Sequence, residues 1–243
     1  MEKNLLITGS TSQVGINLLR EIHKDYNRIY LQFRQMNQDF ENLLTEINQP
    51  ERITLLQADL SQDDDIEKMI ESMLSFGSPP NQIVHLPFPK AYNKQFHKDK
   101  WGNYDLAWSV SVKSIVIILQ ALIPMMTKTQ YGRIVFMLTS NTVNNPPSFQ
   151  SSYVTVKYAL LGLMKALSSE YIKKGITVNG ISPNMMETKF LSELPQIIVE
   201  QNAFNSPLGR NVRVDEIIPI IQYLLSDAGG AMTGQNIAVT GGL

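Results

Sequence analysis

Tyr153 and Lys157 are the two residues whose types and spacing point most directly to chemistry. They stand four apart in a segment where apolar residues recur at helical spacing through Leu160, Met164 and Leu167. Positions four apart lie on one face of a helix, so the phenol and the ammonium lie side by side. A nearby cation favours the phenolate and lowers a pKa that is about 10 in free tyrosine. The pair predicts an acid–base catalyst, although an isolated pair at this spacing also occurs by chance.

A turn with two glycines follows the first apolar run, residues 4–8. A strand, a glycine turn and a helix in this order suit a dinucleotide site. The glycines let the backbone approach the pyrophosphate, and the helix N-terminus offers unpaired N–H groups. An ordinary strand-to-helix turn has the same appearance. The candidate cofactor residues here are Gly9, Ser10, Thr11, Ser12, Gln13, Val14 and Gly15.

Two later strand ends bear on which dinucleotide would bind. Arg34 ends the second apolar run, and no acid stands at positions 32–34. An acid there would hydrogen-bond the ribose 2′-hydroxyl of NAD, whereas an arginine accommodates the 2′-phosphate of NADP. Asp59, followed by Leu60, ends the third run, where a carboxylate can accept a hydrogen bond from the adenine amino group. The sequence favours NADP(H) and leaves NAD(H) possible; a solvated loop cation is the alternative for Arg34.

Strands and helices alternate along the whole chain, which predicts one α/β domain of the Rossmann type over residues 1–243. A seven-stranded parallel sheet with helices on both faces is expected. The predicted strands are residues 4–8, 28–33, 53–57, 82–86, 133–138, 176–181 and 236–240. The predicted helices are residues 38–48, 63–74, 105–129, 151–173 and 214–226. Residues 183–208 are the most irregular stretch and are interpreted as a substrate lid.

The composition is that of a globular protein, with 43% hydrophobic and 18% charged residues and a net charge of −1. This balance does not favour nucleic acid or an anionic membrane as partner. No apolar run reaches the ~18 residues of a membrane span, and the N-terminus has no signal-peptide layout. Cysteine is absent, and His23, His85 and His97 lack metal-ligand spacing, so no metal site is expected. A cytoplasmic location is the expectation.

With these motifs in register, the chain resembles the short-chain dehydrogenase/reductase family, most of all its 3-oxoacyl-carrier-protein reductase branch. Residues 132–140 resemble the family's fifth strand with its catalytic serine, here Ser140, thirteen residues before Tyr153. Tyr153 and Lys157 match the Tyr-x-x-x-Lys signature, whereas the related enoyl reductases use a longer gap. Residues 176–188 resemble the sixth strand and nicotinamide loop, with Pro183 and Thr188 as cofactor contacts.

The chain also departs from the family pattern in four places that face the cofactor. Gln13 stands where the turn usually has its middle glycine, and a left-handed conformation there would cost about 1–2 kcal/mol. The family's Asn-Asn-Ala-Gly segment reads His85-Leu86-Pro87-Phe88. Ser111 replaces the asparagine that holds a proton-relay water, and Pro183-Asn184 replaces Pro-Gly.

The resemblance implies hydride transfer between a nicotinamide and a carbonyl carbon. Tyr153 would then be the general acid/base, and Lys157 would lower its pKa and hold the nicotinamide ribose. Ser140 would bind the substrate oxygen, with Thr139 as an alternative for that role, and Ser111 would carry the relay water. This assignment requires Tyr153 and Lys157 to face the cleft at the carboxyl ends of the strands. It also requires that Gln13 and Phe88 do not fill that cleft.

The substrate and partners are less determined by the sequence. The stretch after Pro183 is apolar, which suits an acyl-type or specialised-metabolite ketone or simply the packing of the lid itself. Its apolar residues are Met185, Met186, Phe190, Leu191, Leu194, Ile197, Ile198 and Phe204. Residues 90–101 mix cations with aromatics, which fits an acidic carrier protein or, more plainly, a solvated loop. The resemblance implies a homodimer or homotetramer. The competing hypothesis is a non-catalytic binding or structural protein that keeps the fold but binds cofactor weakly.

Overall fold

The computed structural model describes residues 2–89, 93–188 and 196–242 and contains a seven-stranded sheet. The order of its strands is β3-β2-β1-β4-β5-β6-β7, and all neighbours run parallel. The strands are β1 Asn4–Thr8, β2 Arg28–Phe33, β3 Ile53–Gln57, β4 Gln82–His85, β5 Gly132–Met137, β6 Ile176–Pro183 and β7 Asn236–Val239. The order reverses between β1 and β4. At such a reversal α/β proteins bind ligands in a crevice outside the carboxyl ends of the strands, so the crevice of this protein is expected there.

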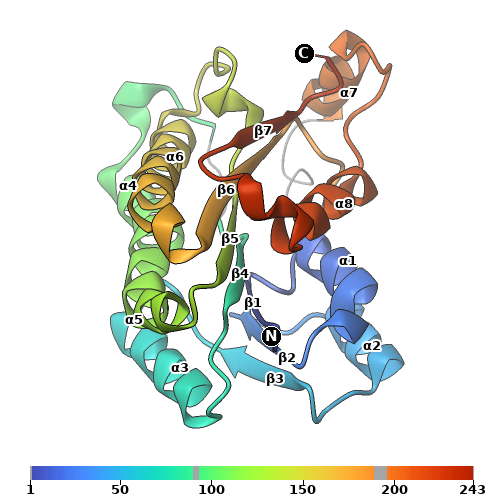
Figure 1. The fold of residues 1–243 in the computed structure, drawn as a ribbon. Coiled ribbons are helices and arrows are strands. Elements are labelled where there is room, and N and C mark those ends of the chain that lie inside the picture. Colours follow the sequence, from blue (N-terminus) through green and yellow to red (C-terminus); the bar gives the residue numbers. More distant parts are fainter. Residues whose placement is uncertain (1, 90–92, 189–195, 243) are drawn as a thin grey trace.

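Helices cover both faces of the sheet (Figure 1). They are α1 Gln13–Ile22, α2 Gln38–Ile47, α3 Asp63–Ser75, α4 Trp101–Trp108, α5 Ser114–Thr129, α6 Ser151–Tyr171, α7 Gln196–Asn205 and α8 Val214–Leu225. One face carries α3, α5 and α6, and the opposite face carries α1, α2 and α8. The predicted fold, a doubly wound parallel sheet, is confirmed.

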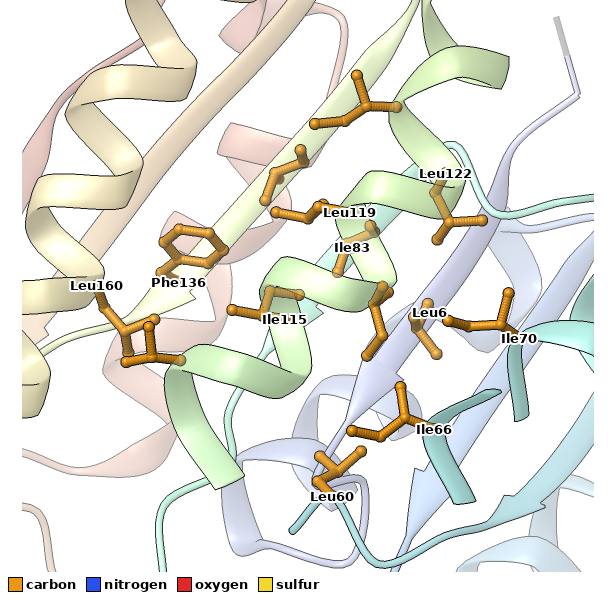
Figure 2. Packing of buried hydrophobic residues seen from close by; sticks show 14 of the residues in the cluster. Leu6, Leu60, Ile66, Ile70, Ile83, Ile115, Leu119, Leu122, Phe136 and Leu160 are labelled. Atoms are coloured by element: carbon orange, nitrogen blue, oxygen red, sulfur yellow. The ribbon is translucent and has the colours of Figure 1, made fainter. Parts of the chain in front are cut away.

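Two apolar cores result, one on each face of the sheet. In the first, Ile115, Leu119 and Leu122 of α5 point toward the sheet and meet Ile83 of β4 and Phe136 of β5 (Figure 2). The second core joins the other face of the strands to α1, α2 and α8. Because both faces are covered, the central strands are apolar almost throughout instead of alternating.

The long helix predicted over residues 105–129 begins earlier and is interrupted. It starts at Trp101, and residues Ser109–Lys113 form a π-turn between α4 and α5. Such π-turns often occur at functional sites. The combined helix Trp101–Thr129 is long and apolar enough to cross a membrane by length and composition alone. However, 56% of its most apolar window is buried inside the protein, as in the core helix of a globular domain.

The stretch predicted as an irregular lid, residues 183–208, contains a helix. Helix α7 occupies Gln196–Asn205, and Ile197 and Phe204 on it are 67% and 86% exposed. Phe190, Leu191 and Leu194 lie outside the described residues. The other predicted strands and helices end within two residues of the observed ones, except that α4 precedes the predicted start of the long helix.

Candidate active site

The glycine turn connects β1 to α1 at the crevice, and both of its glycines are required by the backbone. Gly9 has a φ of +70°, which side-chain-bearing residues rarely adopt. A Cβ on Gly15 would lie 2.6 Å from the Ser10 carbonyl oxygen, so helix α1 can approach the turn only with glycine there. Gln13 is the first residue of α1 and has no positive φ, so the predicted left-handed strain at this position is wrong. Gln13 causes no backbone strain, because it is the first residue of α1 and no left-handed conformation is required there.

Gln32, a residue not singled out from the sequence, holds this turn in place. Its side-chain oxygen accepts a hydrogen bond from the Gly9 N–H at 2.9 Å, and its amide donates to the Ala58 carbonyl at 2.8 Å. The Ser10 hydroxyl donates to the Gln32 carbonyl at 2.8 Å. Ser10 is fully buried and Val14 lies in the core, so both support the turn from inside. The sequence shows Gln32 only as a polar residue in a mostly apolar strand, which does not reveal this role.

The remaining residues of the turn present backbone and hydroxyl groups. Ser12 caps α1, since its side chain accepts from the Gly15 N–H at 3.1 Å. The Thr11 carbonyl accepts from the Asn37 amide at 2.9 Å, which ties the turn to the start of α2. The N-terminus of α1 therefore faces the crevice with its first turn fixed, as a phosphate site requires.

The residues predicted to select the dinucleotide lie at neighbouring strand ends. Arg34 directly follows β2 and is exposed. Asp59 follows β3, and its Oδ1 accepts from the Ser61 N–H and hydroxyl at 2.9 and 2.8 Å. Leu60 is buried in the first core. Arg34 and Asp59 thus stand at the carboxyl edge of the sheet, whereas the Leu60 side chain packs inside.

Tyr153 and Lys157 lie in the first two turns of α6, which packs against β6 and the end of β5. Lys157 is only 3% exposed, and its Nζ donates to the carbonyl of Met137, the last residue of β5, at 2.6 Å. Nζ lies 5.8 Å from the centroid of the Tyr153 ring. The pair therefore stands at the carboxyl ends of the strands, as predicted.

Burial changes the acidity of both groups. It lowers the pKa of Lys157 to about 7, because the charged ammonium is removed from water. Burial also raises the pKa of Tyr153, and a side-chain hydrogen bond from Thr139 lowers it by less. The prediction that Lys157 lowers the Tyr153 pKa is therefore wrong for this arrangement. The Lys157 ammonium donates to the Met137 carbonyl, and burial of the phenol itself dominates the pKa of Tyr153.

Two hydroxyls follow β5, and they have different partners. The Thr139 side chain accepts from the Asn141 N–H at 3.4 Å and lies close enough to the Tyr153 phenol to lower its pKa. The Ser140 Oγ donates to the Asn184 Oδ1 at 3.4 Å, across to the segment after β6. The sequence predicts Thr139 as an alternative to Ser140 and Asn184 as a substitute for glycine. Both hydroxyls directly follow β5, whose last carbonyl accepts from Lys157.

Phe88 lies directly against the catalytic pair. Its ring meets the Tyr153 ring edge-on, with centroids 4.8 Å apart and planes at 80°. The Lys157 Nζ lies 5.3 Å from the centroid of the same ring. The expectation that Phe88 leaves this part of the crevice open is therefore wrong. The ring covers the pair because the Leu86-Pro87-Phe88 segment passes from β4 toward α6.

A buried histidine fixes the segment that carries Phe88. His85 bonds the Ser111 carbonyl through Nε2 at 2.9 Å and the Thr8 hydroxyl through Nδ1 at 2.8 Å. A carbonyl only accepts, so Nε2 carries the proton and Nδ1 accepts from Thr8. Burial lowers the pKa of His85 to about 3, which keeps the ring neutral. The Ser111 hydroxyl donates to the Pro87 carbonyl at 2.9 Å. Ser111 is fully buried, and its hydroxyl and carbonyl both bond the protein.

The residues predicted to hold the nicotinamide end follow β6. Pro183 is buried as the last residue of β6, and the Asn184 N–H donates to the Val239 carbonyl at 3.0 Å. Thr188 is half-buried at the end of the described part of this loop. The crevice is thus bordered by the glycine turn on one side and by α6 with the post-β6 loop on the other.

This site and fold agree with comparisons to known proteins. A family model described as enoyl-(acyl carrier protein) reductase matches residues 26–243. The chain belongs to the short-chain dehydrogenase/reductase family. Members of this family are oxidoreductases, and the predicted family and enzyme class are therefore confirmed.

Three known proteins match this chain over almost its full length. A 3-oxoacyl-(acyl-carrier-protein) reductase of Staphylococcus epidermidis is 25% identical over 247 residues, covering 100% of this chain and 99% of the relative. A D-beta-hydroxybutyrate dehydrogenase of Rhizobium meliloti is 25% identical over 258 residues, covering 100% and 98%. The structure of a 3-oxoacyl (acyl-carrier-protein) reductase of Agrobacterium tumefaciens with NADP bound has a TM-score of 0.88 at 21% identity, covering 99% and 94%.

Proposed function

We propose that the protein is an NADPH-dependent ketoreductase that reduces an acyl-type or related ketone to an alcohol. The observation that carries this proposal is the Tyr153–Lys157 pair at the carboxyl ends of the strands next to the strand-order reversal, where Lys157 is buried and Tyr153 is half-buried. A lysine whose pKa is lowered by burial, next to a tyrosine at this edge of the sheet, is typical of a functional site.

The residues present fit a dinucleotide along the crevice. The turn from Gly9 to Gly15 and the N-terminus of α1 would hold the pyrophosphate, with the close approach that both glycines permit. Arg34 at the end of β2 suits a 2′-phosphate. Lys157 would hold the nicotinamide ribose, and Pro183 and Thr188 would hold the carboxamide side. When bound, the nicotinamide supplies the hydride that reduces the carbonyl carbon.

The chain's own residues supply the proton and orient the substrate. Because the pKa of Tyr153 is raised, the phenol is protonated at neutral pH, which is the form needed to protonate an alkoxide during reduction. Ser140 and Thr139 would donate hydrogen bonds to the carbonyl oxygen and stabilise the charge that develops on it. The Ser111 hydroxyl donates to the Pro87 carbonyl, so Ser111 influences the position of the next residue, Phe88. The role of Ser111 in holding a relay water stays a prediction.

The apolar surface of α7 supports an acyl-type substrate. Ile197, Ile198 and Phe204 on α7 are exposed, so α7 offers an apolar surface near the loop that follows β6. The Staphylococcus epidermidis relative is named for a 3-oxoacyl substrate on a carrier protein. Exposed apolar residues on α4 and α6, Trp108 and Tyr158, support self-association through these helices as a dimer or tetramer.

Turnover of a 3-oxoacyl thioester tests this function. NADPH consumption with acetoacetyl-CoA as the probe is followed by absorbance, and NADPH binding by nicotinamide fluorescence. Binding of NADPH together with turnover that Tyr153→Phe abolishes would support the reductase. A wild-type protein that binds no NADPH at millimolar concentration would contradict it and favour the non-catalytic hypothesis.

A further inference from the structure

The Leu86-Pro87-Phe88 segment spans the crevice at the reversal of strand order. Pro87 packs on the glycine turn: its Cγ lies 3.3 Å, and its N 3.4 Å, from where a Cβ on Gly9 would stand. One residue later, Phe88 reaches Tyr153 on α6. The segment therefore touches the turn proposed for the pyrophosphate and the pair proposed for the nicotinamide ribose. Any dinucleotide that joins these two places must pass this segment.

The Phe88 ring is the apolar cover of the Lys157 ammonium. Nζ contacts the Met137 carbonyl at 2.6 Å on one side and lies 5.3 Å from the Phe88 centroid on another. The Tyr153 ring completes the surroundings, with its centroid 5.8 Å from Nζ. A ribose hydroxyl that binds both the ammonium and the phenol would have to reach them where the Phe88 ring now lies.

We propose that Phe88 is an aromatic gate, whose ring covers the Tyr153–Lys157 pair and must rotate away before the nicotinamide ribose can bind. This inference rests on the proposed function, because it assumes that the crevice takes a dinucleotide. The gate weakens binding of the nicotinamide half only. Binding of the adenosine half, at the glycine turn and Arg34, does not depend on it.

The backbone before Phe88 is anchored, so the gate opens by side-chain rotation. The Pro87 carbonyl accepts from the Ser111 hydroxyl, and the Ser111 carbonyl accepts from buried His85. These two bonds hold the segment against the π-turn. The opening cost therefore includes the loss of the edge-on contact with Tyr153 and of the cation–π contact with Lys157. A site that is open in only a fraction of molecules binds more weakly by that fraction.

Binding of two ligands to Phe88→Ala tests the gate. NADPH spans both halves of the crevice, whereas adenosine 2′,5′-bisphosphate occupies only the adenosine half. Isothermal titration of both ligands should show NADPH binding about tenfold tighter to Phe88→Ala than to the wild type. Adenosine 2′,5′-bisphosphate should bind both proteins within about twofold of each other. Phe88→Leu, which keeps bulk but loses the aromatic contacts, should lie between them.

Phe76→Ala is the matched control. Phe76 also meets a tyrosine edge-on, Tyr30 at 6.1 Å, and also lies under a cation, Arg28 at 4.8 Å, but it precedes the loop that enters β4. Its loss should leave both affinities unchanged. Circular dichroism confirms that each variant is folded before titration.

The outcomes separate the gate from the proposed function. Unchanged or weaker NADPH binding by folded Phe88→Ala and Phe88→Leu, with adenosine 2′,5′-bisphosphate still bound, would overturn the gate alone. If no variant binds either ligand, both the gate and the dinucleotide site are overturned. Equal tightening of both ligands would also overturn the gate, because the effect would not be confined to the nicotinamide half.

Discussion

Two trios of the same composition, a phenylalanine, a tyrosine and a cation, lie at opposite edges of the sheet. Phe88, Tyr153 and Lys157 stand at the carboxyl edge, where Lys157 bonds the end of β5. The other trio, Phe76, Tyr30 and Arg28, stands beside the loop that enters β4. The contacts are of the same kinds, and a sequence pattern of rings and cations would not separate them.

The cations and tyrosines of the trios differ in their surroundings. Arg28 keeps access to water and donates to the Thr54 hydroxyl at 3.1 Å, whereas buried Lys157 has its pKa lowered to about 7. The Tyr30 phenol donates to the Ser78 carbonyl, and the Tyr153 phenol faces the Thr139 hydroxyl. Residue type alone therefore does not make a site. Tyr30 is fully buried, and burial raises its pKa as it raises that of Tyr153. The two trios therefore differ in the cation: Lys157 is buried at the carboxyl ends of the strands, whereas Arg28 is only half-buried.

Replacing the two tyrosines should give the largest contrast. Tyr153→Phe removes the proton donor and should lower turnover of a ketone by about 10³-fold, within the range for general acid catalysis. NADPH affinity should stay within about twofold. Tyr30→Phe should leave turnover near that of the wild type. Steady-state kinetics on both variants checks this, and equal activity of Tyr153→Phe and the wild type would remove Tyr153 from the mechanism.

Acid should lower the stability of the protein through His85, which is buried as a neutral ring near the carboxyl edge of the sheet. The pKa of His85 is lowered from 6.5 to about 3 in the folded protein. As the pH falls, the imidazole of the unfolded chain is therefore protonated at a higher pH than that of the folded protein. Stability is thus fully present above pH 6.5 and is lost as the pH falls toward 3, by about 2–3 kcal/mol at about pH 4.

Urea unfolding at several pH values measures this loss. His85→Asn cannot titrate, so its free energy of unfolding should fall less steeply below pH 6.5 than that of the wild type. Parallel curves for the two proteins would show that His85 is not neutral and buried in the native state. Comparing slopes avoids the fixed cost of losing one of the two His85 hydrogen bonds.

The two cations should respond differently to replacement by methionine. Lys157 titrates near 7 when folded and at its ordinary value of 10.5 when unfolded, so its burial opposes folding below that upper value. Lys157→Met should therefore be more stable than the wild type by about 1–3 kcal/mol at neutral pH. The gain should shrink as the pH rises toward 10.5. Arg28→Met should show no such pH-dependent gain in thermal or urea unfolding, and a constant gain for Lys157→Met would contradict the lowered pKa.

The smallest effect is expected at the glycine turn. Gln13 begins α1 with ordinary helical geometry, so Gln13→Gly should lower the free energy of unfolding by about 0.5–1 kcal/mol. Relief of strain would instead raise it. Chemical denaturation of the variant decides between the two, with Asn17→Ala nearby as a variant that keeps the turn.

The fold was predictable because strand–helix alternation and buried apolar strands follow directly from the chain. The placement of Tyr153, Lys157, Ser140 and the two glycines also followed from motif spacing. The direction of the Tyr153 pKa did not, because it depends on desolvation and on where Nζ points. These are properties of the packed structure.

Three further features could not be read from the sequence. The π-turn at Ser109–Lys113 changes the helix register without any proline or glycine to mark it. Gln32 supports the turn through tertiary hydrogen bonds that cross to β1 and β3. The direction of the Phe88 side chain depends on how Ser111 and His85 hold the segment after β4. These two residues lie far apart in the chain.

A crystal structure with NADPH bound tests the central claim most directly. The account predicts that the nicotinamide ribose contacts the Lys157 Nζ and the Tyr153 phenol, with the Phe88 ring rotated off Tyr153. A dinucleotide bound elsewhere, or one whose nicotinamide lies away from Tyr153 while the Phe88 ring keeps its edge-on contact, would contradict it.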